Sequence, residues 1–179
     1  MKKIKTLVLN SLVELFLTKK MAIFASLLLT VTIAPIAKQQ MITGPIVNAA
    51  LFASVILLGF RGAFLIAFLP SLFAIQFGLL PIVMTPLIPF IIASNFILVF
   101  IFSYLRKTNY WLGIVSASFI KFIFLFTSSS VIVSLFIKGP AAKNIAQMMS
   151  WPQLITALSG GLVVYLFLKI YDSKKQKNF

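Results

Sequence analysis

Long runs of apolar residues, separated by short polar or basic stretches, occupy most of this chain. A helix needs about 20 apolar residues, with a range of about 17–25, to cross the hydrocarbon core of a bilayer. Six runs predict membrane-spanning helices, at residues 21–37, 46–60, 63–77, 89–105, 111–136 and 152–170. The second and third are short, so they need tilt, a thinned bilayer or extension into the loops. The pattern predicts an all-α integral membrane protein, a bundle of six short transmembrane helices within residues 21–170.

The first 20 residues have a different pattern. Three lysines precede an apolar run at residues 7–17 that polar residues interrupt, and Lys19 and Lys20 follow it. The large apolar residues of this run largely cluster on one side at helical spacing, which predicts an N-terminal interfacial amphipathic helix. A cleaved signal peptide is the competing interpretation, but no small-residue cleavage site precedes Lys19. At the other end, residues 171–179 form a basic, polar tail that we expect in the cytoplasm.

Three connections between the predicted spans carry distinctive residues. Residues 38–45 form a polar loop in which Gly44 and Pro45 end one helix and start the next. Residues 78–89 hold three prolines among apolar residues, and such irregular backbone is tolerated at membrane depth only where protein or water covers it. This stretch is either a loop over the outer end of the bundle or a plain tight connection. Residues 139–151 form a longer connection that can hold a short interfacial helix.

The amino-acid composition excludes or disfavours several classes of function. With 61% hydrophobic and 10% charged residues, the chain lies far outside the range of soluble domains. It has no Cys and no His, which excludes disulfides and most zinc, haem and iron–sulfur sites. Only two acidic residues are present, which disfavours paired-carboxylate catalysis and a magnesium site. These absences disfavour an enzyme of any ordinary type, and we expect no cofactor. No glycine-rich run ends in Lys-Ser or Lys-Thr, so we expect any ATP-driven step to belong to a partner.

The basic residues predict the orientation of the bundle. A total of 16 basic residues is typical of a nucleic-acid-binding protein, but here they are spread among the segment ends and not gathered on one soluble face. Six spans put both termini on one side, and that side receives twelve of the Lys and Arg residues against three on the other. By the positive-inside rule both termini are cytoplasmic, in a multi-pass protein of the cell membrane. A ligand from outside the cell would arrive at the opposite face.

Lys121 is the one basic residue near the middle of a predicted span, since Lys169 lies at the very end of the last one. Counted from Trp111, its Cα lies roughly 15 Å deep, near the centre of a core about 30 Å thick. An ionisable side chain at that depth is costly to bury and is by default a functional-site hypothesis. The two carboxylates, Glu14 and Asp172, lie outside the apolar segments. Three alternatives follow: Lys121 is neutral, it pairs with a group that the protein does not encode, or it bonds to carbonyls and to hydroxyls such as those of Ser116, Ser118 or Thr127.

Small residues form a stripe along the first predicted span. Ala22, Ser26, Thr30 and Ala34 recur every four residues, so they share one face of a helix. Small residues at that spacing let a second helix approach closely in lipid. The stripe indicates either packing inside this bundle or docking of a partner subunit.

The placement of glycine and proline resembles that in the substrate-binding S components of energy-coupling factor (ECF) vitamin transporters. The second span opens with Thr-Gly-Pro-Ile-Val-Asn-Ala at residues 43–49, and Gly-Leu-Leu-Pro at 78–81 leads to Pro-Leu-Ile-Pro at 86–89 and then to Asn95. The resemblance covers nearly the whole chain. It implies six short spans and a vitamin or related micronutrient bound near the outer face, under the first and third loops. It also implies partners: a transmembrane T subunit that contacts the small-residue face of the first helix, and two cytoplasmic ATPases.

The resemblance includes no substrate-specific motif, so we choose the candidate ligand-binding residues from the polar residues of the sequence. Lys121 argues for a small ligand with an anionic group such as a carboxylate, because a paired charge is far cheaper to bury than a lone one. The nominated residues are those at membrane depth and those of the first and last hairpins: Lys121, Asn95, Gln39, Gln40, Thr43, Asn48, Gln147, Trp151 and Gln153.

Two other functions compete with a ligand-binding subunit. A structural or assembly protein, such as a small membrane anchor, predicts that Lys121 packs against carbonyls with no cavity beside it. A channel or secondary carrier is disfavoured because the halves show no inverted repeat and no acidic residue is placed to carry a coupling proton. A closed polar cavity in the outer half, reached by Lys121 or Asn95, favours the binding subunit, and a continuous pore favours the channel.

Overall fold

A computed structural model describes residues 2–76 and 82–177, and every regular element in that part of the chain is helical. The α-helices are α1 (Lys2–Ile33), α2 (Gln40–Leu57), α3 (Gly59–Gln76), α4 (Ile88–Leu105), α5 (Tyr110–Phe136), α6 (Pro140–Met148) and α7 (Trp151–Lys177). Two 3₁₀ turns, Ala34–Ala37 and Ile82–Leu87, precede α2 and α4. The Gly-Leu-Leu-Pro stretch and the side chains that define the amphipathic pattern at residues 1–16 lie outside the described residues.

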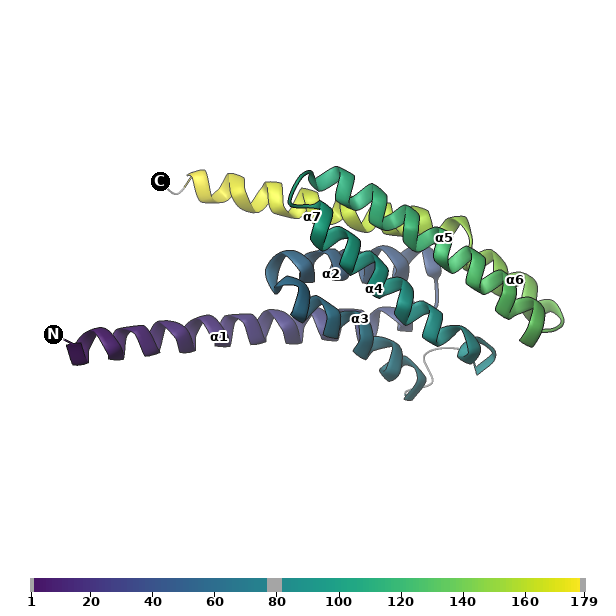
Figure 1. The fold of residues 1–179 in the computed structure, drawn as a ribbon, viewed down its shortest axis with the longest axis horizontal. Helices are drawn as coiled ribbons and strands as arrows, with labels where there is room; N and C mark the ends of the chain where they lie inside the picture. The colour runs from purple at the N-terminus through teal and green to yellow at the C-terminus, as the bar shows by residue number, and fades with distance from the viewer. Residues whose placement is uncertain (1, 77–81, 178–179) are drawn as a thin grey trace.

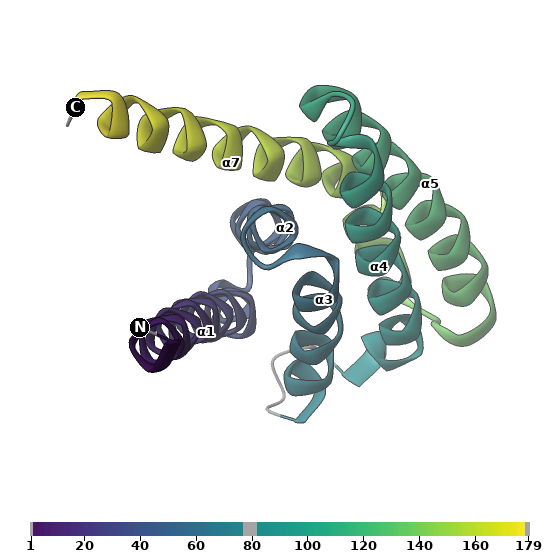
Figure 2. The same ribbon diagram turned by 60° about the vertical axis from the view of Figure 1, so that its left-hand side comes forward.

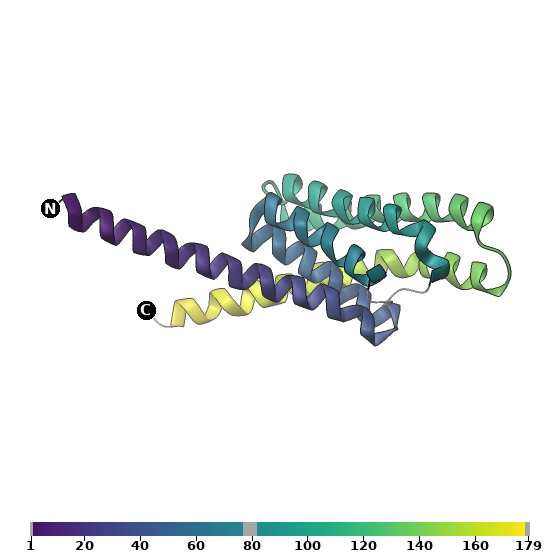
Figure 3. The same ribbon diagram turned by 90° about the horizontal axis from the view of Figure 1, so that it is seen from below.

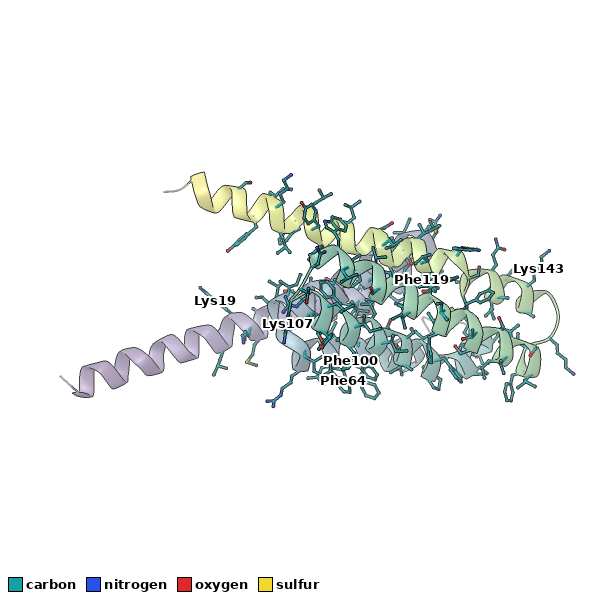
Figure 4. All side chains as sticks on the ribbon, turned by 45° about the horizontal axis from the view of Figure 1, so that its top comes forward. Lys19, Phe64, Phe100, Lys107, Phe119 and Lys143 are labelled. Carbon is teal, nitrogen blue, oxygen red and sulfur yellow. The ribbon has the colours of Figure 1, made fainter. Side chains whose placement is uncertain are left out.

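Five stretches are long and apolar enough to cross a membrane. They cover Leu17–Ala37, Gln40–Leu57, Ile82–Leu105, Tyr110–Phe136 and Ala141–Tyr171, and a shorter apolar helix covers Gly59–Leu69. Five of the six predicted spans are thus long enough to cross a membrane. The third predicted span is not, because its described apolar helix covers only Gly59–Leu69. Large apolar side chains remain exposed along these helices, including Phe64 and Phe100, which point away from the bundle (Figure 4). Such extensive apolar exposure suits a lipid environment and not water.

The N-terminal helix differs from the prediction. Instead of an interfacial helix followed by a separate span, α1 runs unbroken from Lys2 to Ile33 and is straight in Figures 1 and 3. No glycine or proline occurs between these residues, so nothing in the backbone favours a bend near Lys19. The helix ends where Pro35 enters the 3₁₀ turn, and Lys38 then adopts a left-handed conformation at φ 52°.

The predicted loop at residues 38–45 is largely helical. Helix α2 already begins at Gln40, and Gly44 and Pro45 lie inside its first turns. Gly44 is explained by packing: a Cβ there would lie 2.6 Å from the Cβ of Thr156 on α7. The turn to α3 also comes earlier than predicted, because Gly59 supplies the left-handed residue at φ 76°. Helix α3 then continues to Gln76 without interruption at Pro70.

The second half of the chain follows the prediction closely. Helix α5 spans Tyr110–Phe136, with Asn109 as its N-cap accepting a hydrogen bond from the Leu112 amide at 3.0 Å. The longer connection after α5 contains the short helix α6. Helix α7 extends past the predicted end at residue 170 into the basic tail, as far as Lys177.

Helix α2 occupies the centre of the bundle and contacts α1, α3, α4 and α7 (Figure 2). Both termini project from one end, which we call the terminal end, and α6 lies at the opposite end, the α6 end (Figures 1 and 3). Lys19 and Lys107 lie toward the terminal end and Lys143 lies at the α6 end (Figure 4).

The apolar interior is divided into two clusters. The larger, which we call the main core, includes an edge-to-face pair of Phe52 and Phe102 with ring centroids 4.7 Å apart. The smaller, the outer cluster, joins residues of α5 and α6 to the 3₁₀ turn before α4; it consists of Met84, Leu87, Leu125, Val133, Ile137, Ile145 and Met149. Along α5, Ala117 belongs to the main core and Leu125 to the outer cluster. A layer near residue 121 therefore separates the two.

Helices α5 and α7 are joined by a hydrogen bond as well as by packing. The Tyr110 hydroxyl donates to the Gly161 carbonyl oxygen at 2.9 Å, across 51 positions of sequence. Around it, the rings of Phe102, Trp111 and Tyr165 lie within 6 Å of the Tyr110 ring centroid. This bond fixes α7 against the start of α5.

We expect Tyr110→Phe to lower the free energy of unfolding by about 1 kcal/mol, because the ring stays while one hydrogen bond is lost. Thermal denaturation in detergent would measure the change. Tyr104→Phe is the matched control, since Tyr104 is 72% exposed. Equal stability of the two variants would contradict a structural role for the bond to Gly161.

Candidate functional site

The Lys121 amine lies in the layer between the main core and the outer cluster, where it joins three helices. The side chain is 4% exposed. Its Nζ donates to Asn48 Oδ1 on α2 at 2.7 Å and to Asn95 Oδ1 on α4 at 2.9 Å. The amine donates both bonds, so each amide presents its oxygen to it. In its charged form the amine has three N–H donors, of which described residues take up two.

The backbone of α2 orients one of the two amides. Asn48 Nδ2 donates to the Gly44 carbonyl oxygen, one turn earlier, at 2.9 Å. Asn48 is 2% exposed and Asn95 is 7% exposed, so both amide oxygens are held away from bulk solvent. The amine is therefore surrounded by fixed, neutral dipoles.

The partners of Lys121 differ from the hydroxyls expected on its own helix. Thr127 donates instead to the Ile123 carbonyl oxygen at 2.8 Å. The Ser118 hydroxyl is buried without a partner among the described residues, and Ser116 makes no hydrogen bond to Lys121. Lys121 does not bond these hydroxyls because its side chain points away from its own helix, toward α2 and α4. No described carboxylate neutralises the amine, which leaves it suited to a negatively charged partner.

A cavity of about 150 Å³, which we call the inner chamber, is lined by Lys121 and by the two asparagines that it bonds. Six of the nominated residues line it: Lys121, Asn95, Asn48, Gln40, Thr43 and Gln153. Thr43 donates its hydroxyl to the Ala34 carbonyl oxygen at 3.1 Å, and Gln153 Nε2 donates to the Met148 carbonyl oxygen at 3.2 Å. The rest of the lining is mainly apolar. The chamber thus combines a cationic and amide-bearing wall with apolar walls.

A second, open pocket of about 380 Å³ lies at the α6 end, and we call it the outer chamber. It is lined by Gln40, Met41, Asn144, Gln147, Met148 and Pro152. Gln40 and Met148 line both chambers, so their side chains stand between the two. Gln147, nominated from the sequence, belongs to the outer chamber only.

Two nominated residues lie in neither chamber. Trp151 is 63% exposed and stacks on Phe122, with ring centroids 5.1 Å apart. Gln39 is exposed at the N-cap of α2. The sequence predicts a loop at both residues, but helices begin at Gln40 and Trp151, and the two side chains lie outside the chambers.

Several residues of the inner chamber are not indicated by the sequence alone. Ser71 and Ser94 line it and are 7% and 0% exposed. Met84, Met148 and Met149 add flexible apolar walls near the α6 end. A serine within an apolar run signals only helix packing, because its hydroxyl can bond to its own helix, as Ser94 does to the Ile91 carbonyl oxygen at 2.8 Å.

Three residues of the small-residue stripe lie on α1, and the fourth lies in the 3₁₀ turn that follows it. Ala22, Ser26 and Thr30 are exposed, whereas Ala34 is 8% exposed within the 3₁₀ turn. Thr30 also borders an apolar groove of about 370 Å³ between α1, α2 and α7. Three members of the stripe are therefore accessible to another molecule, and the fourth belongs to the interior.

The polar groups of the inner chamber are able to bind a small molecule. No group of three or more metal-ligating side chains occurs in the described part of the chain. Lys121 can hold an anion or a hydrogen-bond acceptor, and the amides around it can orient that group. No known protein family, curated protein or solved structure gave a significant match to this chain.

Proposed function

We propose that this protein is the membrane-embedded, substrate-binding subunit of an ATP-driven micronutrient importer, similar to an ECF S component. The observation that carries the proposal is the Lys121 amine beside a cavity, with two of its three donors on Asn48 and Asn95. The third donor is available to an anionic ligand. Pairing with such a ligand offsets the cost of burying the amine.

The position of the inner chamber agrees with capture from outside the cell. Its lining includes Gln40, Met84 and Met148, which belong to the α6 end. With the basic termini in the cytoplasm, that end faces outward. The main core, including Phe52 and Phe102, lies toward the terminal end and would block passage through the bundle. Release inward therefore requires the T subunit and its two ATPases, for which the exposed face of Ala22, Ser26 and Thr30 offers a contact.

A structural anchor is the second candidate function. It is favoured by one observation, since the hydrogen bonds of Lys121 tie α5 to α2 and α4 and so also stabilise the bundle. An anchor needs no cavity at this point, whereas the inner chamber adjoins the same amine. The cavity favours binding over a purely structural role.

Native mass spectrometry of the detergent-purified protein tests the proposal. We expect a small molecule of discrete mass to accompany the wild type, or to be taken up from a vitamin panel, and to be lost from Lys121→Met. Lys143→Met is the matched control because Lys143 is exposed and lines neither chamber. If no form retains or takes up a ligand while all remain folded, the binding function is wrong and the anchor is favoured.

A further inference from the structure

The volume of the inner chamber limits what can bind beside Lys121. A cavity of about 150 Å³ is of the size that accommodates a benzene-sized group. Typical ligand pockets measure about 300–1,000 Å³, and the two chambers together come to about 530 Å³. A micronutrient-sized ligand therefore needs both chambers, and only one end of it fits against the amine.

The two chambers differ in chemistry. The inner chamber is lined by Lys121, and apolar side chains such as Leu51, Ile91 and Leu125 form much of its wall. The outer chamber has no charged residue in its lining and presents side-chain amides from Gln40, Asn144 and Gln147. An amide both donates and accepts hydrogen bonds, so this chamber suits an uncharged polar group.

The boundary between the chambers can adapt. Only Gln40 and Met148 are shared by the two linings. Both side chains are partly exposed, and a methionine has three rotatable bonds that let it fit different shapes. Turning these two side chains aside would join the chambers without moving a helix.

From these contrasts we propose that the ligand is an elongated monoanion, with its carboxylate on Lys121, an apolar middle in the inner chamber and an uncharged polar tail in the outer chamber. This inference rests on the proposed binding function and adds the chemical class and direction of the ligand. The tail contacts Asn144 and Gln147, which project from one side of α6 at a spacing of three residues.

Two synthetic acids test this inference. Hexanoate carries the carboxylate and the apolar chain, and 6-acetamidohexanoate adds an uncharged amide at the far end. We expect the longer acid to bind the wild type about tenfold more tightly, since two hydrogen bonds of about 0.7 kcal/mol each are worth that factor. In Asn144→Ala/Gln147→Ala this ratio of affinities should fall to about one. Radiolabelled probes and detergent-purified protein would give both affinities.

Lys143→Ala is the matched control on α6. Lys143 is exposed and lines neither chamber, and its long-range attraction for the two singly charged acids cancels from the ratio. The ratio should therefore stay near tenfold in this variant. Hexanamide tests the anionic contact, because a neutral analogue that binds as tightly as hexanoate would overturn the assignment of the carboxylate to Lys121.

The outcomes separate this inference from the binding function. If hexanoate binds and the longer acid binds no more tightly, the outer chamber does not hold the tail and the inference is wrong, while the binding function stands. If native mass spectrometry finds a ligand but neither acid binds, the chemical class is wrong. If no small molecule binds by either method, both proposals fail together.

Discussion

Replacing both Asn48 and Asn95 with leucine should lower the free energy of unfolding by about 3 kcal/mol or more, since hydrogen bonds to a charged group contribute about 1.5–3 kcal/mol each. The substitution leaves the Lys121 amine among apolar side chains, where an unpaired charge is costly. Chemical denaturation in a fixed detergent would measure the change. The loss is larger than that expected from deleting any single hydroxyl bond in the bundle.

A rescue experiment separates the cost of the stranded amine from that of changed packing. Adding Lys121→Met to the double variant removes the charge, and apolar replacement of a whole buried polar cluster is often neutral or stabilising. Most of the lost stability should therefore return in the triple variant, although ligand binding should not. Ser94→Ala on α4 is the control, because the Ser94 hydroxyl bonds only to its own helix. A triple variant no more stable than the double would show that leucine overpacks the layer.

Gly160→Val should be the most damaging single substitution between α2 and α7. A Cβ at Gly160 would lie 2.7 Å from the Ala49 amide nitrogen and 2.9 Å from the Asn48 Cβ. Because one of these neighbours is backbone, α2 and α7 would have to separate, and overpacking of this kind costs about 1–3 kcal/mol or more. Asn48 would move with α2 and away from Lys121, so ligand affinity should fall together with stability.

The thermal denaturation temperature and the ligand affinity of Gly160→Val would be measured on the same detergent preparation. Leu162→Val is the matched control, since it introduces the same β-branched residue into α7 at a position that is 46% exposed. A Gly160→Val protein with the stability and affinity of the wild type would contradict the close approach of α7 to Asn48.

Most helices could be predicted from the sequence because lipid-facing helices must be uniformly apolar. The 26-residue span that carries Lys121 agrees with α5 to within one residue. The start of α2 could not be predicted in this way, since Gly44 and Pro45 indicate a break when only local propensity is considered. Gly44 instead lets α2 pack closely against Thr156, which lies more than 100 residues later in the chain. No local sequence pattern indicates such a contact.

Six of the residues around the inner chamber could be predicted from the sequence, but their hydrogen bonds could not. Asn95 and Lys121 stand out as polar residues at membrane depth, which follows from counting along each span, and Asn48 stands out as a polar residue of the first hairpin. Which of them meet depends on how α2, α4 and α5 are rotated and packed. The same limit applies to Trp151: the sequence predicts it at the end of a loop, whereas it begins α7, and its stacking on Phe122 depends on the neighbouring helix.

The polar layer at Lys121 divides the bundle into parts of unequal size. The main core draws on α1, α2, α3, α4, α5 and α7, while the outer cluster is small and centres on α5, α6 and the turn before α4. Regions with fewer buried apolar contacts open locally at a lower free-energy cost than whole-molecule unfolding. Amide hydrogens of α6 should therefore exchange with solvent sooner than those around Phe52. A ligand could then enter through brief fluctuations of the outer part while the inner half of the bundle keeps its native packing.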